Sequence, residues 1–482
     1  MRNLSNADCG MQNAEYKSFT PNSEFKIFRD PHSEFRNRNR EDKNMTYESQ
    51  KVALKYFVIS AIFFGLQAIV GLLLVSKYIW PDPLIGILPF NTARAIHTNL
   101  LVVWMIFGFM GGTYYIVPEE SGTELFSKKL ADLQFYLLLL GGLVGIVGFL
   151  FGWTAGRPLL ELPVELKWAI VIVALIFIFN VFMTMIRTKK WTAIQGMLLG
   201  GIVMLAIMWL FGIPFFKNLT LDYYYWWWVI HLWVEGAWEL IAASIMAFVL
   251  LKITGVDRQI IEKWLYVEVA LVLITGIIGT GHHYYWIGTP KYWLWWGGIF
   301  SALEPVPIIF MVFDTLNHVR HKKIEITNRL VLYWAVGCAI FHFIGAGVWG
   351  FAHTLPVVNR WTHGTQVTAS HGHMAFFGAY AMLILTMIYY ALPKLKGLEQ
   401  FSQKRGFWVF WITTISMAVM GLAFGVAGVI QSYMWRGLGM DFLTVQGFMR
   451  PWFMVVLFGG LGLFTGVIIY IIDVLTLASK KN

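Results

Sequence analysis

The stretch W-W-W-V-I-H-L-W-V-E-G-A-W-E, residues 226–239, sets one histidine and two glutamates inside an otherwise apolar segment. His231 and Glu235 are four residues apart and share one face of a helix, and Glu239 follows a turn later along the same stripe. A carboxylate buried at membrane depth without a partner costs several kcal/mol. We therefore interpret the stretch as part of a metal site or proton path, or else as a His–Glu pair that only ties helices together.

The composition around this stretch is that of a membrane protein. The chain has 482 residues, of which 57% are hydrophobic and 13% charged, and its apolar runs repeatedly exceed the roughly 20 residues that cross a bilayer. The sequence therefore predicts an all-α polytopic membrane protein with about twelve transmembrane helices. We expect these spans near residues 54–78, 93–117, 131–153, 165–186, 192–212, 223–251, 264–288, 296–317, 329–352, 366–392, 406–431 and 451–475.

The basic residues follow this topology. The net charge is +10, but lysine and arginine are scattered through short loops, which argues against a nucleic-acid partner. They concentrate in alternate loops, for example those near residues 128, 189, 258, 322 and 404. The positive-inside rule places these loops and both termini in the cytoplasm.

The ends of the chain and its cysteines add two expectations. Residues 1–50 are polar and read as a disordered tail, in which Met45 is a second candidate start, and residues 51–482 form the transmembrane domain. Cys9 and Cys338 are the only cysteines, and there is no C-x-x-C-H motif. Any heme must therefore be held by histidine.

The ionisable side chains of the predicted spans gather at one depth. At roughly 1.5 Å per helical residue, they lie about 10 Å below the outer surface. The residues of this layer are His97, His231, His282, His283, Glu304, His371 and His373. Structural histidines with unrelated roles have no reason to share a depth, so we infer one buried cofactor site.

Two histidines on the tenth predicted span are suited to two different groups. His371 and His373 are two residues apart, which is about 200° on a helix, so they cannot ligate the same metal. The small Gly372 and Gly378 leave room for a flat macrocycle, and His97 can supply a second axial ligand. A bis-histidine heme suits electron transfer, whereas an iron with one histidine keeps an open face.

A second metal can lie between the sixth and seventh predicted spans. His231, His282 and His283 supply three nitrogens, and Glu235 can add a carboxylate oxygen. Three imidazoles alone suit copper or zinc, and the hard oxygen ligand shifts the preference towards non-heme iron. By contrast, we attribute His342, His353 and His363 to interfacial hydrogen bonds, and the tryptophans at 226–228 to an aromatic belt.

From about residue 52 to the end, the chain resembles the heme-copper oxidase superfamily, and within it the catalytic subunits of cytochrome c-dependent bacterial nitric oxide reductases. The resemblance is carried by R-A-I-H-T-N-L-L-V-V-W-M-I-F-G-F-M-G, Y-Y-W-W-W-V-I-H-L-W-V-E-G-A-W-E-L, G-I-I-G-T-G-H-H-Y-Y-W-I-G, F-S-A-L-E-P-V-P, G-A-G-V-W-G-F-A-H-T-L-P and H-G-T-Q-V-T-A-S-H-G-H-M-A-F-F-G-A-Y-A-M.

The resemblance assigns ligands. It implies two hemes b, one low-spin on His97 and His373 and one high-spin on His371. It also implies a non-heme iron on His231, His282, His283 and Glu235, with Glu239 and Glu304 as further glutamates that deliver protons or tune charge. A calcium ion is expected with Gly108 and Glu161, although the loop at residues 153–164 is shorter than the family's.

The resemblance also implies the reaction and its setting. Two NO molecules would be reduced to nitrous oxide and water, in the denitrifying respiratory chain of a bacterial inner membrane, with electrons from a membrane-anchored cytochrome c subunit. Protons would come from the outer side, where the three glutamates lie. The alternatives are an oxygen reductase of the same superfamily, which would contain copper, and a proton-coupled secondary transporter, which would contain no heme.

Overall fold

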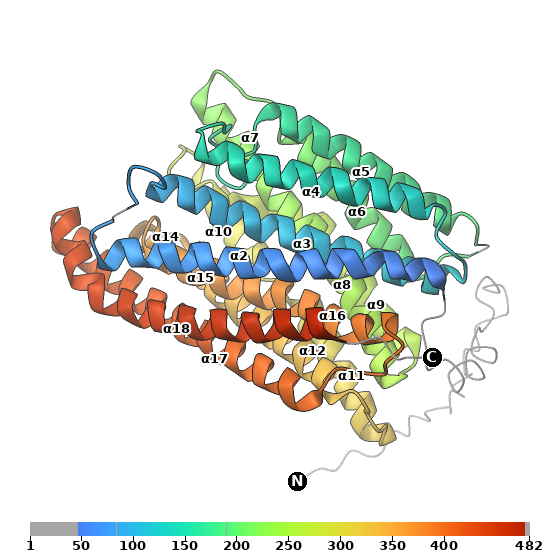
Figure 1. Ribbon diagram of the computed structural model, residues 1–482. Coiled ribbons are helices and arrows are strands. Elements are labelled where there is room, and N and C mark those ends of the chain that lie inside the picture. The colour runs from blue at the N-terminus through green and yellow to red at the C-terminus, as the bar shows by residue number, and fades with distance from the viewer. Residues whose placement is uncertain (1–46, 83, 189, 478–482) are drawn as a thin grey trace, which may run out of the picture. The chain divides into compact units, whose positions relative to one another are not determined.

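The computed structural model describes residues 47–477 except 83 and 189 (Figure 1). Every regular element in this part is helical, and twelve spans are long and apolar enough to cross a membrane. The predicted all-α fold with twelve spans is thereby confirmed. The elements are η1 (Glu48–Val52), α2 (Ala53–Ile79), α3 (Phe90–Ser121), α4 (Lys128–Leu150), α5 (Val164–Met185), α6 (Ala193–Phe211), α7 (Leu219–His231), η2 (Leu232–Trp238), α8 (Glu239–Thr254), α9 (Arg258–Gly279), η3 (Thr280–His283), α10 (Lys291–Ser301), α11 (Val306–Lys322), α12 (Arg329–His342), η4 (Phe343–Gly350), α13 (Phe351–Thr354), α14 (Pro356–Thr362), α15 (Gln366–Phe376), η5 (Phe377–Ala381), α16 (Met382–Leu395), α17 (Gln403–Ser432), η6 (Tyr433–Gly437) and α18 (Phe442–Thr476).

Three spans form the centre of the bundle. In the most apolar windows of α3, of α7–η2–α8 and of α15–η5–α16, 83%, 83% and 89% of the residues are buried, whereas the other spans are half buried or less. Helix α2 packs against α3, α18 packs against α2, and α17 packs against both α18 and α15. These three helices therefore cover one side of the centre (Figure 1). The three central spans carry all the histidines of the predicted heme sites, so those side chains face protein rather than lipid.

One end of the bundle carries the loops rich in lysine and arginine, and we call it the basic end. It comprises the loops after α3, α5, α8, α11 and α16. Here Arg258 pairs with Glu120 at 2.8 Å and with Glu262 at 3.0 Å, and Lys252 pairs with Glu119. Such partly exposed pairs contribute up to about 1 kcal/mol each, and they join the ends of α3, α8 and α9.

Several predicted spans are not continuous α-helices. The sixth, ninth and tenth contain the π-helical turns η2, η4 and η5. The eighth breaks between α10 and α11, where Pro305 and Pro307 lack the backbone N–H that a continuous helix would use. Breaks of this kind widen or redirect a helix, and these lie in or beside spans that carry the site.

The predicted tail is described only at its end. Glu48–Val52 form a 3₁₀-helix in which Ser49 and Gln50 are buried. Residues 47–50 are therefore structured, unlike the disordered tail expected to run to residue 50. The rest of the predicted tail, Met45 included, lies outside the described residues.

Candidate metal centre and heme sites

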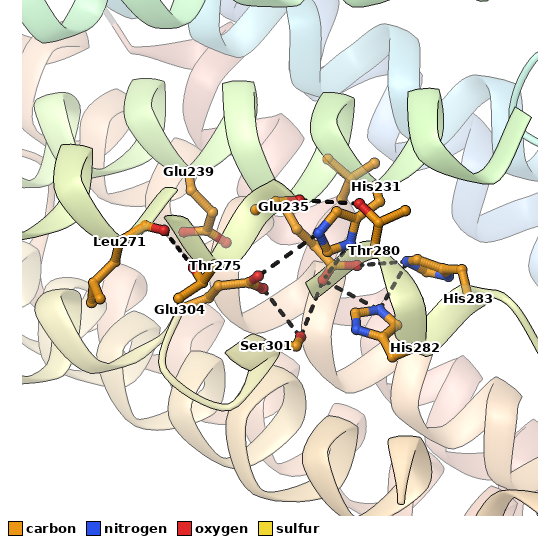
Figure 2. A network of polar contacts seen from close by, with 12 residues as sticks. His231, Glu235, Glu239, Leu271, Thr275, Thr280, His282, His283, Ser301 and Glu304 are labelled. Carbon is orange, nitrogen blue, oxygen red and sulfur yellow. Dashed lines mark hydrogen bonds and ion pairs between the residues drawn. The ribbon is translucent and has the colours of Figure 1, made fainter. Parts of the chain in front are cut away.

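The central helix of the site changes its winding at the residues that carry the chemistry. His231 ends α7, and Glu235 lies in the π turn η2. In a pure α-helix Glu239 would be rotated about 80° from His231, but the extra residue of one π turn reduces this to about 20°. The π turn therefore aligns the side chains that α-helical spacing alone would spread, and Figure 2 shows them on the same side of the helix.

The histidine pair lies at the end of its span, which closes at His283 and not at residue 288 as expected. Helix α9 ends at Gly279, and His282 and His283 lie in the 3₁₀ turn η3. A Cβ at Gly297 of α10 would lie 2.2 Å from the His282 backbone nitrogen. The missing side chain therefore lets η3 pack directly on α10, which fixes the histidine pair.

Four side chains from these two segments converge. Ligand atoms of His231, Glu235, His282 and His283 all lie within 4.8 Å of one another. His231 Nδ1 is 3.2 Å from Glu235 Oε2, His283 Nε2 is 3.2 Å from Glu235 Oε1, and the two Nε2 atoms of His282 and His283 are 2.9 Å apart (Figure 2). Ligands of one metal with bonds of about 2.1 Å lie roughly 3 Å apart, so the set fits a metal ion.

Ser301 and Glu304 lie next to the Glu235 carboxylate of this set. The Ser301 hydroxyl lies 3.5 Å from Glu235 Oε2 and 3.3 Å from Glu304 Oε2, and links the two carboxylates (Figure 2). Glu304 is 7% exposed and lies in the break between α10 and α11. Its Oε1 is 3.9 Å from His231 Nε2, so Glu304 borders the four ligands without joining them.

One tryptophan assigned to the aromatic belt has a role in the site. The Trp227 ring stacks on His283, with ring centroids 5.0 Å apart and planes only 5° apart. Trp227 is four residues before His231, so a helix presents both on one face. That spacing was the signal available in the sequence.

His97 and His373 face each other across a gap suited to one iron. Their ring centroids are 6.3 Å apart, and two imidazoles on opposite sides of one iron would hold theirs about 6 Å apart. His97 Nδ1 lies 3.0 Å from the Gln67 carbonyl oxygen, and His373 Nδ1 lies 2.8 Å from that of Ala369. Donation from each Nδ1–H leaves Nε2 free to ligate a metal.

His371 is held in the same manner on the other side of α15. Its Nδ1 lies 3.0 Å from the Gly345 carbonyl oxygen in η4. A Cβ at Gly350 would lie 2.8 Å from His371 Cε1, so this glycine admits the ring. Nearby His353 has both ring nitrogens within 3.1 Å of threonine hydroxyls, so His371 offers the free nitrogen here.

The two glycines expected to admit a macrocycle differ. A Cβ at Gly372 would meet nothing within 4 Å, as expected. A Cβ at Gly378, in contrast, would lie 2.5 Å from the Phe341 carbonyl carbon and 2.6 Å from the His342 backbone nitrogen. Gly378 therefore serves the close packing of η5 against α12, and not a macrocycle.

Glu239 lies in a buried polar cluster that the sequence did not predict. Its Oε1 accepts a hydrogen bond from the Tyr380 hydroxyl at 2.9 Å and lies 3.3 Å from His342 Nε2. His342 is 1% exposed, so the interfacial role given to it is wrong. Tyr380 lies in the π turn η5, so α-helical spacing from His373 does not set its direction, and no usable signal for this contact lay in the sequence.

The two residues expected at a calcium ion are not brought together. Glu161 is 2% exposed and accepts a hydrogen bond from Asn99 Nδ2 at 3.0 Å. Gly108 lies nine residues beyond Asn99 on α3, about 13 Å along the helix, and packs against Ile384. Glu161 lies in the loop after α4, and burial raises the pKa of its carboxyl group.

Comparison with known proteins identifies the family. The sequence pattern described as "Cytochrome C and Quinol oxidase polypeptide I" matches residues 51–462. The chain belongs to this family. Within it, the nitric oxide reductase B subunit of Stutzerimonas stutzeri is 46% identical over 450 residues, which cover 89% of this chain and 95% of that protein.

More distant members of the family are also similar along most of their length. The cbb3-type cytochrome c oxidase subunit CcoN1 of Stutzerimonas stutzeri is 26% identical over 88% of this chain and 94% of its own. A solved structure of a heme-copper terminal oxidase dimer superimposes with a TM-score of 0.72 at 17% identity, over 90% of this chain and 84% of that one. The latter likeness establishes the heme-copper oxidase fold.

Proposed function

We propose that this chain is the catalytic subunit of a nitric oxide reductase, which reduces two NO to nitrous oxide and water with two electrons and two protons. The proposal is supported by the 46% identity to a nitric oxide reductase B subunit. The single observation that carries it is the convergence of a glutamate with three histidines within 4.8 Å. A carboxylate oxygen in the ligand set favours iron over copper.

The residues divide into two heme-binding sets and one iron-binding set. His97 and His373 would hold a low-spin heme b, and His371 a high-spin heme b, each through the Nε2 that its backbone hydrogen bond leaves free. His231, His282, His283 and Glu235 would hold a non-heme iron. When bound, these groups would supply electron storage and the binding of NO.

The chain's own residues contribute orientation and protons. Glu304 borders the ligand set, and the Ser301 hydroxyl joins its Oε2 to Glu235 Oε2. A proton held on Glu304 can therefore pass through the Ser301 hydroxyl to the carboxylate of Glu235. His231 is fully buried and the Glu304 side chain is 7% exposed, so the ligand set reaches into the protein interior, where two small reactants can be held close together.

The setting follows from the charges of the loops and from the family. We propose that the basic end faces the cytoplasm of a bacterial inner membrane, and that a membrane-anchored cytochrome c subunit delivers electrons at the opposite end. Calcium stays a prediction, with Glu161 as the carboxylate that would bind it.

Metal and heme analysis of the purified protein tests the proposal. We expect two hemes b and one additional iron without copper. Glu235→Ala should lose the additional iron and the activity but keep both hemes, whereas Glu325→Gln, at an exposed loop position, should keep all three. Two hemes with one copper would instead assign the chain to the oxygen reductases, and a protein without heme absorbance would favour a transporter.

A further inference from the structure

A series of aromatic rings in contact leads from the metal centre towards the end of the bundle opposite the basic end. The Trp227 ring stacks on His283 with centroids 5.0 Å apart, and the Trp226 ring stacks on Trp227 with centroids 4.7 Å apart and planes 21° apart. The Tyr223 ring follows, with its centroid 5.5 Å from that of Trp226. These separations are those of aromatic rings in direct contact. We call Tyr223, Trp226 and Trp227 the aromatic row.

One helix sets most of these contacts. Tyr223, Trp227 and His231 follow one another at intervals of four residues on α7, so they lie along one stripe of the helix. Trp226 is three residues after Tyr223, a spacing that also brings two side chains together. Of the contacts described, that between Trp227 and His283 crosses from α7 to η3. The backbone of α7 therefore holds the row in a fixed order beside the metal centre.

The row joins a buried ring to a partly exposed one. Trp226, which the sequence analysis assigned to the aromatic belt, is only 6% exposed. Tyr223 lies in the second turn of α7 and is 36% exposed. The hydroxyl group of Tyr223 can therefore exchange its proton with water, and its ring can be reached by a molecule in solution.

The indole N–H of Trp226 is buried without an acceptor. Its Nε1 has no hydrogen-bond partner among the described residues, although a buried tryptophan N–H usually finds one. Phenylalanine would fill much of the same space without leaving a buried donor unpaired. Unlike phenylalanine, tryptophan can give up an electron to a strongly oxidising metal site. Because its N–H has no acceptor, an oxidised Trp226 keeps its proton and stays oxidising enough to take an electron from Tyr223.

We propose that the aromatic row carries single electrons from a donor in solution to the metal centre when that centre meets hydrogen peroxide. The donor is a one-electron reductant with a transferable hydrogen atom, such as ascorbate or a phenol. One electron passes from Tyr223 to Trp226, then to Trp227, and from there to the centre through the ring that Trp227 stacks on. Electron transfer between rings in contact is favoured because tunnelling falls off steeply with distance.

Electrons and atoms balance over two such passages. Each passage leaves Tyr223 as a neutral radical whose proton goes to water, and a hydrogen atom from the donor restores the hydroxyl group. Two electrons and two protons break the O–O bond and convert hydrogen peroxide into two water molecules, while two donor molecules become radicals. The row is unchanged at the end, and an oxidant that would otherwise damage the ligand side chains is removed.

This inference rests on the proposed function, because it needs a metal ion on the four ligand residues. The row itself binds neither heme nor metal. Substitutions in it should therefore leave the heme and iron content of the purified protein unchanged, and both are measured on every sample that is tested.

Electron paramagnetic resonance of the oxidised holoprotein, frozen after addition of hydrogen peroxide without a donor, tests the row. Tyr223 then supplies one electron and the bound metal the other, so a tyrosyl radical should accumulate. Its signal should narrow in protein grown on ring-deuterated tyrosine. Tyr223→Phe should abolish the tyrosyl signal. Trp226→Phe keeps a ring that is not oxidised under these conditions, and should lose most of it.

Two variants on the same helix provide matched controls. The Tyr225 ring contacts Phe216 and Trp228, and the Trp228 ring stacks on Phe211, so both belong to a different set of contacts. Tyr225→Phe and Trp228→Phe should therefore keep the wild-type radical signal. Loss of the signal in these controls as well as in the row variants would overturn the proposal.

A tyrosyl signal of wild-type size in Tyr223→Phe or Trp226→Phe would also overturn it. If Trp226→Phe does not fold, mass spectrometry of the wild type after repeated peroxide additions gives a second measurement. Oxidation products should concentrate at Tyr223 and Trp226, and equal oxidation of Tyr225 and Trp228 would refute the row. A wild type without the additional iron would refute the proposed function, whereas full iron content without a tyrosyl radical would refute the row alone.

Discussion

Gly71 of α2 controls the position of His97, and its substitution by alanine tests the low-spin heme site. A Cβ at this position would lie 2.9 Å from His97 Cε1, whereas ordinary contacts begin near 3.4 Å, so the ring must retreat by about 0.5 Å. The His97 ring is also 3.0 Å from the carbonyl oxygen of Gln67, which lies on α2 like Gly71. This hydrogen bond would lengthen as the ring retreats from α2. Loss of this bond and a strained rotamer together cost about 2 kcal/mol.

This cost converts into a measurable loss of heme affinity. About 2 kcal/mol corresponds to roughly 30-fold weaker retention of the ligand, within the range of about 10–100-fold for losing a group that orients a metal-binding histidine. We expect Gly71→Ala to show a smaller low-spin fraction in the reduced-minus-oxidised absorption spectrum. It should also release heme faster to an excess of apomyoglobin.

A matched control separates this effect from the general consequence of placing alanine in a helix. Gly447 of α18 is exposed, and a Cβ there would meet nothing within 4 Å. Gly447→Ala should therefore gain only the helix preference of alanine, up to about 1 kcal/mol, and keep the wild-type heme spectrum. A wild-type spectrum and heme release rate in Gly71→Ala would refute the role given to His97.

Three further variants probe other parts of the site. Gly279→Ala puts a methyl group 3.0 Å from Glu304 Oε1; we expect NO turnover to fall several-fold with heme content unchanged, and equal turnover would contradict a role for Glu304. Tyr380→Phe removes a 2.9 Å hydrogen bond to Glu239 and should lower stability by about 1–3 kcal/mol, measured by thermal unfolding in detergent. Burial raises the pKa of the Glu161 carboxyl group above 4.5, so the folded state binds more protons than the unfolded state, and stability falls as pH rises from the unfolded-state pKa to the folded-state pKa. The Tm of Glu161→Gln should therefore exceed that of the wild type by more at about pH 8 than at about pH 4. A Tm difference that does not change with pH would argue against the raised pKa.

The fold and the meeting of the four metal-site residues followed from local features of the sequence. Hydropathy marks each span because the bilayer imposes a length, and the twelve expected spans agree with those in the described residues to within about ten residues at each end. The sequence predicts that four residues meet, because all of them lie near the same ends of neighbouring spans: His231, Glu235, His282 and His283. The structure brings their ligand atoms within 4.8 Å.

The features that the sequence does not predict depend on packing between helices. The π turn at Glu235 and the 3₁₀ turn at His282 leave no hydropathy signal, because they change the winding and not the composition. The partners of Glu239 come from α12 and η5, and no spacing along one helix reveals a contact between three.

The contacts of the histidines separate the proposed heme ligands from the proposed iron ligands. His97, His371 and His373 each direct Nδ1 at a backbone carbonyl oxygen, at 2.8–3.0 Å. A carbonyl oxygen cannot ionise and is fixed by its helix, so these rings keep one tautomer and one orientation whatever the redox state. His231 and His283 instead meet the carboxylate of Glu235, and behind it stand further carboxyl groups. Backbone carbonyl groups thus orient the proposed heme ligands, whereas ionisable side chains surround the proposed iron ligands.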